Sequence, residues 1–140
     1  MNLFLEFIHE HILAVDFAIF VLIWLVQLVI YPSFVLITDS LFNSWHTKYC
    51  KIISYFVIPL MTAQLFESLA SCFFINDLLS WLKACLVISI WVFTFFVSAK
   101  YHGILSSGGK NDLILRKLVK TNWYRTISWS VILVISYIQY

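Results

Sequence analysis

The sequence contains few residues that break a helix and few that carry charge. Only three glycines and two prolines occur among its 140 residues, and Asp, Glu, Lys and Arg make up 11% of the chain, whereas 62% is hydrophobic. A soluble domain of this length could not bury so much apolar surface. The strongly alternating segments that an outer-membrane barrel needs are also missing. The composition therefore predicts an integral membrane protein with one domain, residues 1–140.

Other absences narrow the function. Basic residues do not alternate with aromatic ones in any run, so a nucleic-acid surface is not expected. The cysteines, Cys50, Cys72 and Cys85, form neither a CxxC pair nor a zinc-binding spacing. We interpret them as free thiols that pack like small apolar residues. The N-terminus lacks a basic region and a cleavage site, so we expect a first membrane helix there and not a removed signal peptide.

Four stretches are apolar over the roughly 20 residues that a helix needs to cross a membrane. They predict helices over 4–38, 40–74, 78–105 and 113–140. Helix-capping residues mark three of the starts, at Asp39, Asn76–Asp77 and Asn111–Asp112. The turn SSGGKN offers Gly108 or Gly109 for a helix C-terminus. The predicted fold is all-α: a polytopic membrane four-helix bundle made of two long helical hairpins.

The basic residues predict an orientation. Eight of them fall toward the two tight hairpin turns: Lys48, Lys51, Lys100, Lys110, Arg116, Lys117, Lys120 and Arg125. Lys83 alone falls on the other side. The positive-inside rule then places both turns in the cytoplasm and both termini outside.

Polar residues follow one stripe on each of three helices, since residues 18 apart lie on one line of a helix. His46 and Gln64 are such a pair, and Asp16 and Gln27 also share a face. We expect these stripes to face inward, because polar groups facing lipid are costly. The first resulting cluster lies on the cytoplasmic side and contains Gln27, Tyr31, His46, Tyr49, His102, Asn122 and Arg125. The second, deeper cluster contains Asp16, Gln64 and Glu67.

The two clusters predict different chemistry. Counted at ~1.5 Å per residue from separate turns, His46 and His102 lie at matched depth, ~10 Å below the hairpin tips. We expect them to line a pocket that Arg125 or Asn122 closes from below. The two acids Asp16 and Glu67 are expected to share a proton or bind a cation.

Structural explanations stay open for several of these residues. The two histidines could reach water at the interface, Arg125 could bind lipid phosphates, and Asn122 could simply join helices. The HEH stretch at 9–11 places its side chains on different helix faces, so we expect it to be solvated.

Five stretches occur in an order that resembles a known family: WLVQLVIYPSF (24–34), FNSWHTKYCKII (42–53), PLM (59–61), YHGIL (101–105) and LVKTNWYRTISW (118–129). The family consists of small four-helix bacterial membrane proteins, and it looks distantly like the anthrone-oxygenase-like group. This resemblance implies a multi-pass protein of the bacterial cytoplasmic (inner) membrane. Through the distant group it implies cofactor-independent oxidation of an aromatic substrate. Family members commonly have an arginine after the last tryptophan, where this chain has SVILV.

The first function hypothesis is a membrane oxidoreductase that acts on a lipophilic, quinone-like or aromatic substrate. His46 or His102 would be the general base, with Tyr49 beside it, and Arg125 would stabilise a carbonyl or oxyanion. The predicted substrate-binding residues are Gln27, Tyr31, Asn122 and Trp123. A metal or haem between the two histidines is a variant, with an incomplete ligand set.

Two other hypotheses remain: a non-catalytic accessory subunit of a larger membrane complex, and a proton or ion pathway through Asp16, Gln64 and Glu67. The expected partners are the lipid bilayer and a small lipophilic ligand, and no nucleic acid. Assembly into a homo-oligomer or a larger complex stays open.

Overall fold

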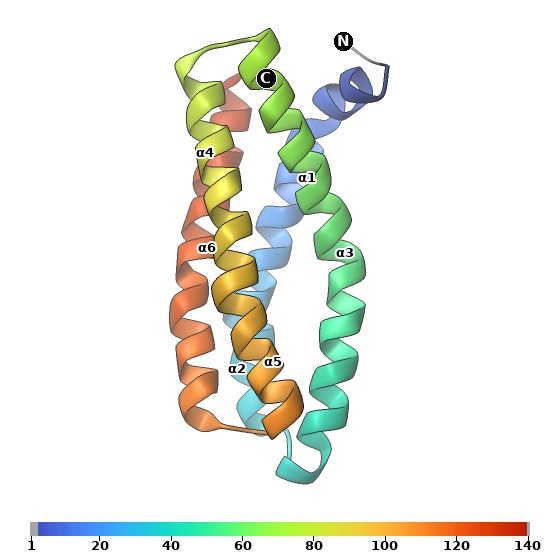
Figure 1. The fold of residues 1–140 in the computed structure, drawn as a ribbon, viewed down its shortest axis with the longest axis vertical. Helices are drawn as coiled ribbons and strands as arrows, with labels where there is room; N and C mark the ends of the chain where they lie inside the picture. The colour runs from blue at the N-terminus through green and yellow to red at the C-terminus, as the bar shows by residue number, and fades with distance from the viewer. Residues whose placement is uncertain (1–2, 140) are drawn as a thin grey trace.

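The computed structural model of the protein describes residues 3–139 and arranges them as four long helices (Figure 1). The first helix comprises α1 (Leu3–Leu25), the π-helical η1 (Val26–Ile30), α2 (Tyr31–Ser33) and the 3₁₀ turn η2 (Phe34–Leu36). The second is α3 (Asp39–Phe74). The third comprises α4 (Leu78–Phe93), the π-helical η3 (Thr94–Ser98) and α5 (Ala99–Gly108). The fourth is α6 (Asp112–Gln139).

The helices run antiparallel in sequence order. The first and last described residues and the connection at 75–77 lie at one end of the bundle, the terminal end, and the connections at 37–38 and 109–111 lie at the other, the hairpin end (Figure 1). The first helix packs against α3 and α6, and α4 also contacts both. The predicted all-helical bundle of four helices is confirmed, with boundaries that differ by a few residues from the sequence-based ones.

Three helices of the described chain are long and apolar enough to cross a membrane: 6–36, 39–74 and 78–108. The sequence predicted four such helices, and α6 is the one that falls short. It contains Arg116, Lys117 and Lys120 in its first half, followed by Asn122 and Arg125, and these polar residues lower its mean hydropathy. Its outer surface nevertheless exposes large apolar side chains, including Ile127, Val131, Val134 and Ile138.

The helix ends test the predicted caps. Asp77 accepts a hydrogen bond from the Ser80 amide at 2.7 Å, and Asn111 accepts one from the Ile114 amide at 3.1 Å, as expected. The prediction for α3 is wrong, because Asp39 is already helical and the capping residue, Thr38, makes no side-chain bond. At the end of α5, Gly109 has a φ of 79°, a conformation that favours glycine.

Lys110 joins the two turns of the hairpin end. Its ammonium donates to the carbonyls of Val35 and Ile37, both at 2.8 Å, and lies 3.5 Å from the carboxylate of Asp39. A cation is favourable at the last carbonyls of a helix. This contact holds the end of the first helix beside the start of α6.

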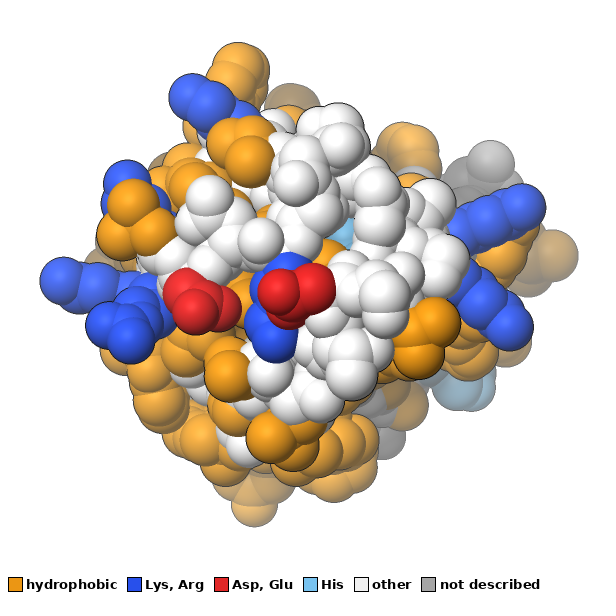
Figure 2. All heavy atoms as spheres, turned by 90° about the horizontal axis from the view of Figure 1, so that it is seen from below, with side chains coloured by type: hydrophobic (Ala, Val, Ile, Leu, Met, Phe, Trp, Pro, Cys, Tyr) orange, Lys and Arg blue, Asp and Glu red, His pale blue; other side chains and the backbone are white. Residues whose placement is uncertain are grey.

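Basic side chains surround the hairpin end, as Figure 2 shows from below. Of the nine Lys and Arg residues, Lys83 and Arg125 are buried inside the bundle, and the other seven are exposed or partly exposed. The sequence-based orientation rested partly on Arg125 as an interfacial charge and placed Lys83 on the opposite side. Without these two buried residues, all seven remaining basic residues lie toward the hairpin end, so the charge asymmetry that predicts the orientation remains.

Candidate functional site

A chain of hydrogen-bonded side chains crosses the bundle near the hairpin end. His46 of α3 and His102 of α5 contact each other through Nε2 and Nδ1 at 3.0 Å. The second nitrogen of His46 lies 2.9 Å from the Ser106 hydroxyl, and that of His102 lies 2.9 Å from the Tyr31 hydroxyl. Each imidazole therefore uses both ring nitrogens. The matched depth predicted for the two histidines is what lets them meet.

An aromatic shell holds the His46 ring, which is fully buried. The ring stacks on Phe42 with centroids 5.3 Å apart and meets Phe34 edge-on at 5.5 Å. Tyr49 stacks on Trp45 at 5.6 Å and lies near both imidazoles, with centroids 6.4 Å from each. This packing fixes the ring direction that the hydrogen bonds need.

Cys50 belongs to the same site. It lies one helical turn after His46, and its sulfur is 3.7 Å from His46 Nε2 and 3.5 Å from His102 Nδ1. The interpretation of Cys50 as an apolar packing residue is therefore wrong. The i, i+4 spacing from His46 was the available signal, because such residues share a helix face.

A cavity of about 250 Å³, the central cavity, lies between the four helices beside this site. Its walls are mainly apolar, and its polar lining includes Tyr31, Tyr49, His102 and Arg125. Two lining residues, Ile58 of α3 and Phe95 of η3, are 56% and 60% exposed. The cavity therefore reaches the apolar surface of the bundle between α3 and η3.

The polar atoms of the central cavity are incompletely paired. Among the described residues, three buried side-chain N or O atoms lack a hydrogen-bond partner: Arg125 Nε, Trp91 Nε1 and Thr94 Oγ1. All three residues line this cavity. Buried polar atoms are nearly always paired, so three orphans at one cavity indicate a site for a ligand or water.

Arg125 is buried, and so does not reach lipid phosphates. Its guanidinium donates to Asn122 Oδ1 at 3.2 Å and to Ser98 Oγ at 3.4 Å, and stacks 4.9 Å over the Trp129 ring. These contacts hold the guanidinium at the cavity wall with Nε unused.

Three predicted substrate-binding residues lie outside the cavity lining. Asn122 donates to Gln27 at 2.8 Å, and Gln27 donates to the Val119 carbonyl at 3.2 Å, so this pair supports Arg125 from behind. Trp123 is 39% exposed and packs edge-on against Trp24. We therefore remove Trp123 from the substrate-binding residues.

Two π-helical segments position groups of the site. Gln27 lies in η1, and Thr94 and Ser98 lie in η3. A π turn inserts an extra residue and so rotates the following side chains, and such turns are frequent at functional sites. The regular 100° rotation used on the sequence could not anticipate them.

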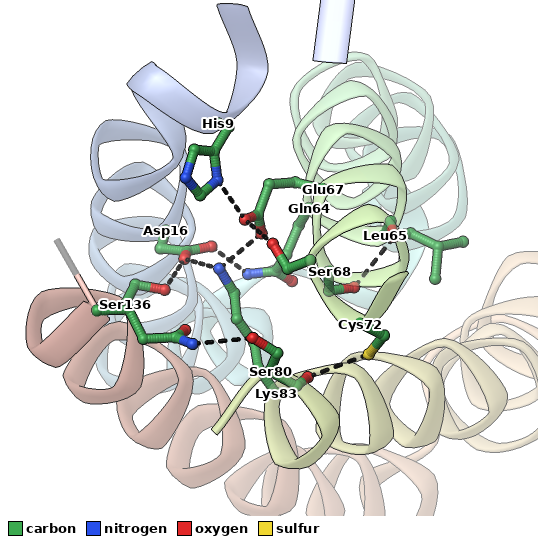
Figure 3. A network of polar contacts seen from close by, with 12 residues as sticks. His9, Asp16, Gln64, Leu65, Glu67, Ser68, Cys72, Ser80, Lys83 and Ser136 are labelled. Atoms are coloured by element: carbon green, nitrogen blue, oxygen red, sulfur yellow. Dashed lines mark hydrogen bonds and ion pairs between the residues drawn. The ribbon is translucent and has the colours of Figure 1, made fainter. Parts of the chain in front are cut away.

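The deeper polar cluster lies in the terminal half of the bundle, and Figure 3 shows its polar contacts. Gln64 donates to Asp16, and Glu67 lies on the same face of α3, so the predicted acid cluster comes together. The predicted cluster contained no basic residue, but the structure adds one. Lys83 is 1% exposed, and its ammonium lies 2.8 Å from Glu67 Oε2 and 3.3 Å from Asp16 Oδ2. A buried cation, missed in the sequence analysis, bridges the two carboxylates.

Hydroxyls and an imidazole complete this cluster. Ser71 donates to Glu67 at 2.7 Å, and Ser136 donates to Asp16. The HEH stretch at 9–11 is exposed, as expected, and His9 Nδ1 also lies 3.1 Å from Glu67 Oε1. A polar cavity of about 190 Å³ leads from this cluster toward the terminal end, and its lining includes His9, Glu10, Glu67, Ser71, Lys83 and Gln139.

Trp129 connects the deeper polar cluster with the central cavity. The Trp129 indole donates to Gln64 Oε1 at 3.0 Å, and its ring carries the Arg125 guanidinium. Internal polar contacts thus continue from the acid cluster to the wall of the central cavity.

No family model matches the chain, and neither a curated protein nor a solved structure matches it significantly. We therefore infer the function from the geometry of the site.

Proposed function

We propose that this membrane protein binds a small lipophilic compound with a carbonyl or phenol oxygen, quinone-like or aromatic, in the central cavity. The observation that carries the proposal is the set of three unpartnered polar atoms, on Arg125, Trp91 and Thr94, around an otherwise apolar cavity. A ligand oxygen can accept from Arg125 Nε and Trp91 Nε1, while the ring fills the apolar space. At about 250 Å³ the cavity suits a ligand below drug size.

The surface around the cavity supports entry from the bilayer. Ile58 and Phe95 flank the mouth, and neighbouring exposed side chains such as Phe56 and Phe96 are apolar as well. A compound dissolved among lipid tails can pass between α3 and η3 without crossing a charged surface.

The enzyme form of the proposal is an oxidoreductase. A bound quinol gives two electrons to an external oxidant such as dioxygen, becomes a quinone, and releases two protons that balance those taken up by the reduced oxidant. The hydrogen-bonded chain from Tyr31 through His102 and His46 to Ser106 leads from the cavity wall toward the hairpin end. His102 would act as base through Tyr31, and Arg125 would stabilise the oxyanion.

In the same proposal α6 crosses the bilayer with the other three helices, which it accompanies along its length (Figure 1). The basic hairpin end faces the cytoplasm and both termini lie outside. The resemblance to small bacterial membrane proteins adds the inner membrane as the location.

Binding of menadione, a small naphthoquinone, to the purified protein in detergent tests the proposal. Trp91 and Trp129 line the cavity, so a bound quinone should quench tryptophan fluorescence saturably. Arg125→Gln should weaken binding roughly 10-fold or more, because a hydrogen bond to a charged group contributes about 1.5–3 kcal/mol. Arg116→Gln, on the same helix but exposed, is the control. Linear, unsaturable quenching in the wild-type protein would refute ligand binding.

A second candidate, proton conduction, is favoured by the buried cluster around Lys83 and by the polar cavity that leads to it. Proteoliposomes with a trapped pH indicator and an imposed membrane potential measure it. Conduction above that of protein-free liposomes, and slowed by Glu67→Gln, is expected if this candidate holds. Equal rates with and without protein exclude it.

A further inference from the structure

We propose that His46, Cys50 and His102 form a three-coordinate copper(I) site with its open side toward the central cavity. The three ligand atoms form a compact triangle whose edges are 3.0 Å between the two nitrogens, 3.5 Å from sulfur to His102 Nδ1 and 3.7 Å from sulfur to His46 Nε2. One potential ligand atom from each of the three residues lies within 4.8 Å of the other two.

This triangle has nearly the dimensions of a coordination sphere. With metal–nitrogen distances of about 2.0 Å and metal–sulfur distances of about 2.3 Å, a trigonal or tetrahedral ion separates its nitrogens by about 3.3–3.5 Å and nitrogen from sulfur by about 3.5–3.7 Å. Both sulfur edges already fall in that range. Only the nitrogen–nitrogen edge, where the two rings now share a hydrogen bond, would have to open, by less than about 0.5 Å.

The outer hydrogen bonds are those that metal-binding histidines usually make. The second nitrogen of each ring already has a partner, Ser106 for His46 Nδ1 and Tyr31 for His102 Nε2, and His46 Nδ1 also lies 3.9 Å from the Cys50 sulfur. Such partners fix the ring orientation and raise ligand basicity. Metal binding would keep both of these bonds and replace only the bond between the rings.

The ligand set and its surroundings favour copper(I). A thiolate and two imidazoles are soft to borderline ligands, and three-coordinate His₂Cys sites are typical of copper. Binding releases the Cys50 proton and takes both imidazoles in their neutral form. Buried aromatic rings, Phe34 and Phe42, cover His46, and so limit access by water.

The open side of the site faces the ligand position. Cys50 and His102 line the central cavity, whereas His46 reaches the triangle from behind. The inference therefore deepens the proposed function and rests on it only in taking this cavity as the substrate site. A copper ion here, alternating between copper(II) and copper(I), would pass the two electrons of a bound quinol one at a time to the external oxidant of the proposed function.

Copper(I) loading of the purified protein under anaerobic conditions tests the site. We expect one copper per chain after desalting, and a chelator competition with bathocuproine disulfonate should show at least 10-fold weaker binding for Cys50→Ser and for His102→Gln. Cys85→Ser and His11→Gln alter exposed residues outside the triangle and should retain wild-type affinity. Equal copper affinity in Cys50→Ser and wild type would overturn the site.

A readout on the wild-type protein avoids dependence on variant folding. Bound copper should protect Cys50, but not Cys85, from alkylation, as measured by peptide mass spectrometry. Alkylation of Cys50 at the same rate with and without copper would overturn the inference. Menadione binding without copper binding would reject the metal site and leave the proposed function intact, whereas copper binding without menadione binding would do the reverse.

Discussion

The ammonium of Lys83 lies 2.8 Å from the Glu67 carboxylate, deep in the terminal half of the bundle. Asp16 lies on the other side of the same ammonium at 3.3 Å, so one cation is shared by two acids from two other helices. Gln64 and Ser71 donate hydrogen bonds to the other two carboxylate oxygens, Asp16 Oδ1 and Glu67 Oε1, and Ser136 donates to the Asp16 oxygen that faces Lys83. Buried charges are tolerated only when paired in this way, so each partner depends on the others.

Removal of the cation should destabilise the bundle strongly. Lys83→Met keeps much of the side-chain length but leaves two buried carboxylates without a partner. Loss of one member of a buried ion pair costs about 3–5 kcal/mol, which unfolding of the detergent-solubilised protein by SDS can measure. Lys100→Met removes an exposed lysine of the same long helix, in α5, and should change the unfolding free energy by less than about 1 kcal/mol. Similar effects of the two substitutions would contradict the buried network.

Lys83 and His46 show which parts of the candidate site could be predicted from the sequence and which could not. The helices, their order and the inward polar stripes follow from hydropathy and from 3.6-residue periodicity, which are local properties. His46 and His102 could be brought together because depth is counted from nearby turns. Lys83 could not be assigned a partner, because its rotation about the helix relative to α1 and α3 depends on packing. Its only signal was a charge in an otherwise apolar stretch.

The central cavity could not be predicted from the sequence either, again because side-chain rotation about the helix was not known. Its orphan polar atoms come from Trp91, Thr94 and Arg125, and Thr94 opens the π-helical η3. A π turn interrupts the regular rotation, so faces counted before it do not extend past it. Cys50, in contrast, could have been assigned to the site from the sequence, since it follows His46 by four residues.

Thr94 offers a test that separates ligand binding from folding. Thr94→Val replaces the buried, unpartnered hydroxyl with a methyl of the same shape, so the ligand-free protein should be equally stable or more stable. If the hydroxyl bonds to the ligand, menadione affinity should fall several-fold, on the order of 1 kcal/mol. Ser89→Ala, outside the cavity lining in the same long helix, is the control. Unchanged affinity in Thr94→Val would exclude Thr94 from the ligand contacts.

The connection between α3 and α4 should respond to acid. Ser80, through its hydroxyl and amide, and Gln139 donate hydrogen bonds to Asp77 and lower the pKa of its carboxyl below its usual range. A group with a lowered folded-state pKa stabilises the protein above its unfolded pKa of about 3.9 and loses that stabilisation as pH falls through the folded-state value. Thermal melts should therefore show Asp77→Ala below wild type at pH 7.

The same comparison at low pH gives the diagnostic result. The difference in melting temperature between wild type and Asp77→Ala should shrink as pH falls below about 4, because the wild-type carboxyl then gains its proton. Asp112→Ala alters an exposed acid of the α6 first turn and controls for general charge effects. A difference that stays constant down to the acid limit would show that Asp77 acts without its charge.

Membrane orientation can be read from one introduced cysteine. Ser107 is exposed at the hairpin end, three residues before Lys110, which joins the two turns. The basic residues at this end predict a cytoplasmic location, so Ser107→Cys should resist a membrane-impermeant maleimide in intact cells and react after lysis. Leu78→Cys, exposed at the terminal end, should react in intact cells. The reverse pattern would invert the proposed topology.

Closing the central cavity should remove ligand binding and spare the metal triangle. Val57 is half-buried on α3 and lines the cavity near its mouth, about two helical turns from Cys50. Val57→Trp places a large ring in existing space, so we expect little loss of stability. The ring competes with the ligand, and menadione affinity should fall at least 10-fold, because a ligand and a buried side chain cannot fill one volume.

Two comparisons make that result specific. Val134→Trp adds the same ring to the exposed apolar surface of α6 and should leave menadione affinity unchanged. Copper binding by Val57→Trp should equal that of wild type, since His46, Cys50 and His102 keep their contacts. Wild-type menadione affinity in a folded Val57→Trp protein would place the ligand outside the cavity. Loss of copper binding together with menadione binding would instead show that the tryptophan ring distorts the cavity wall. Ile53→Phe adds a smaller volume nearer Cys50, and its effects on copper affinity and menadione affinity would then show how closely the two sites are coupled.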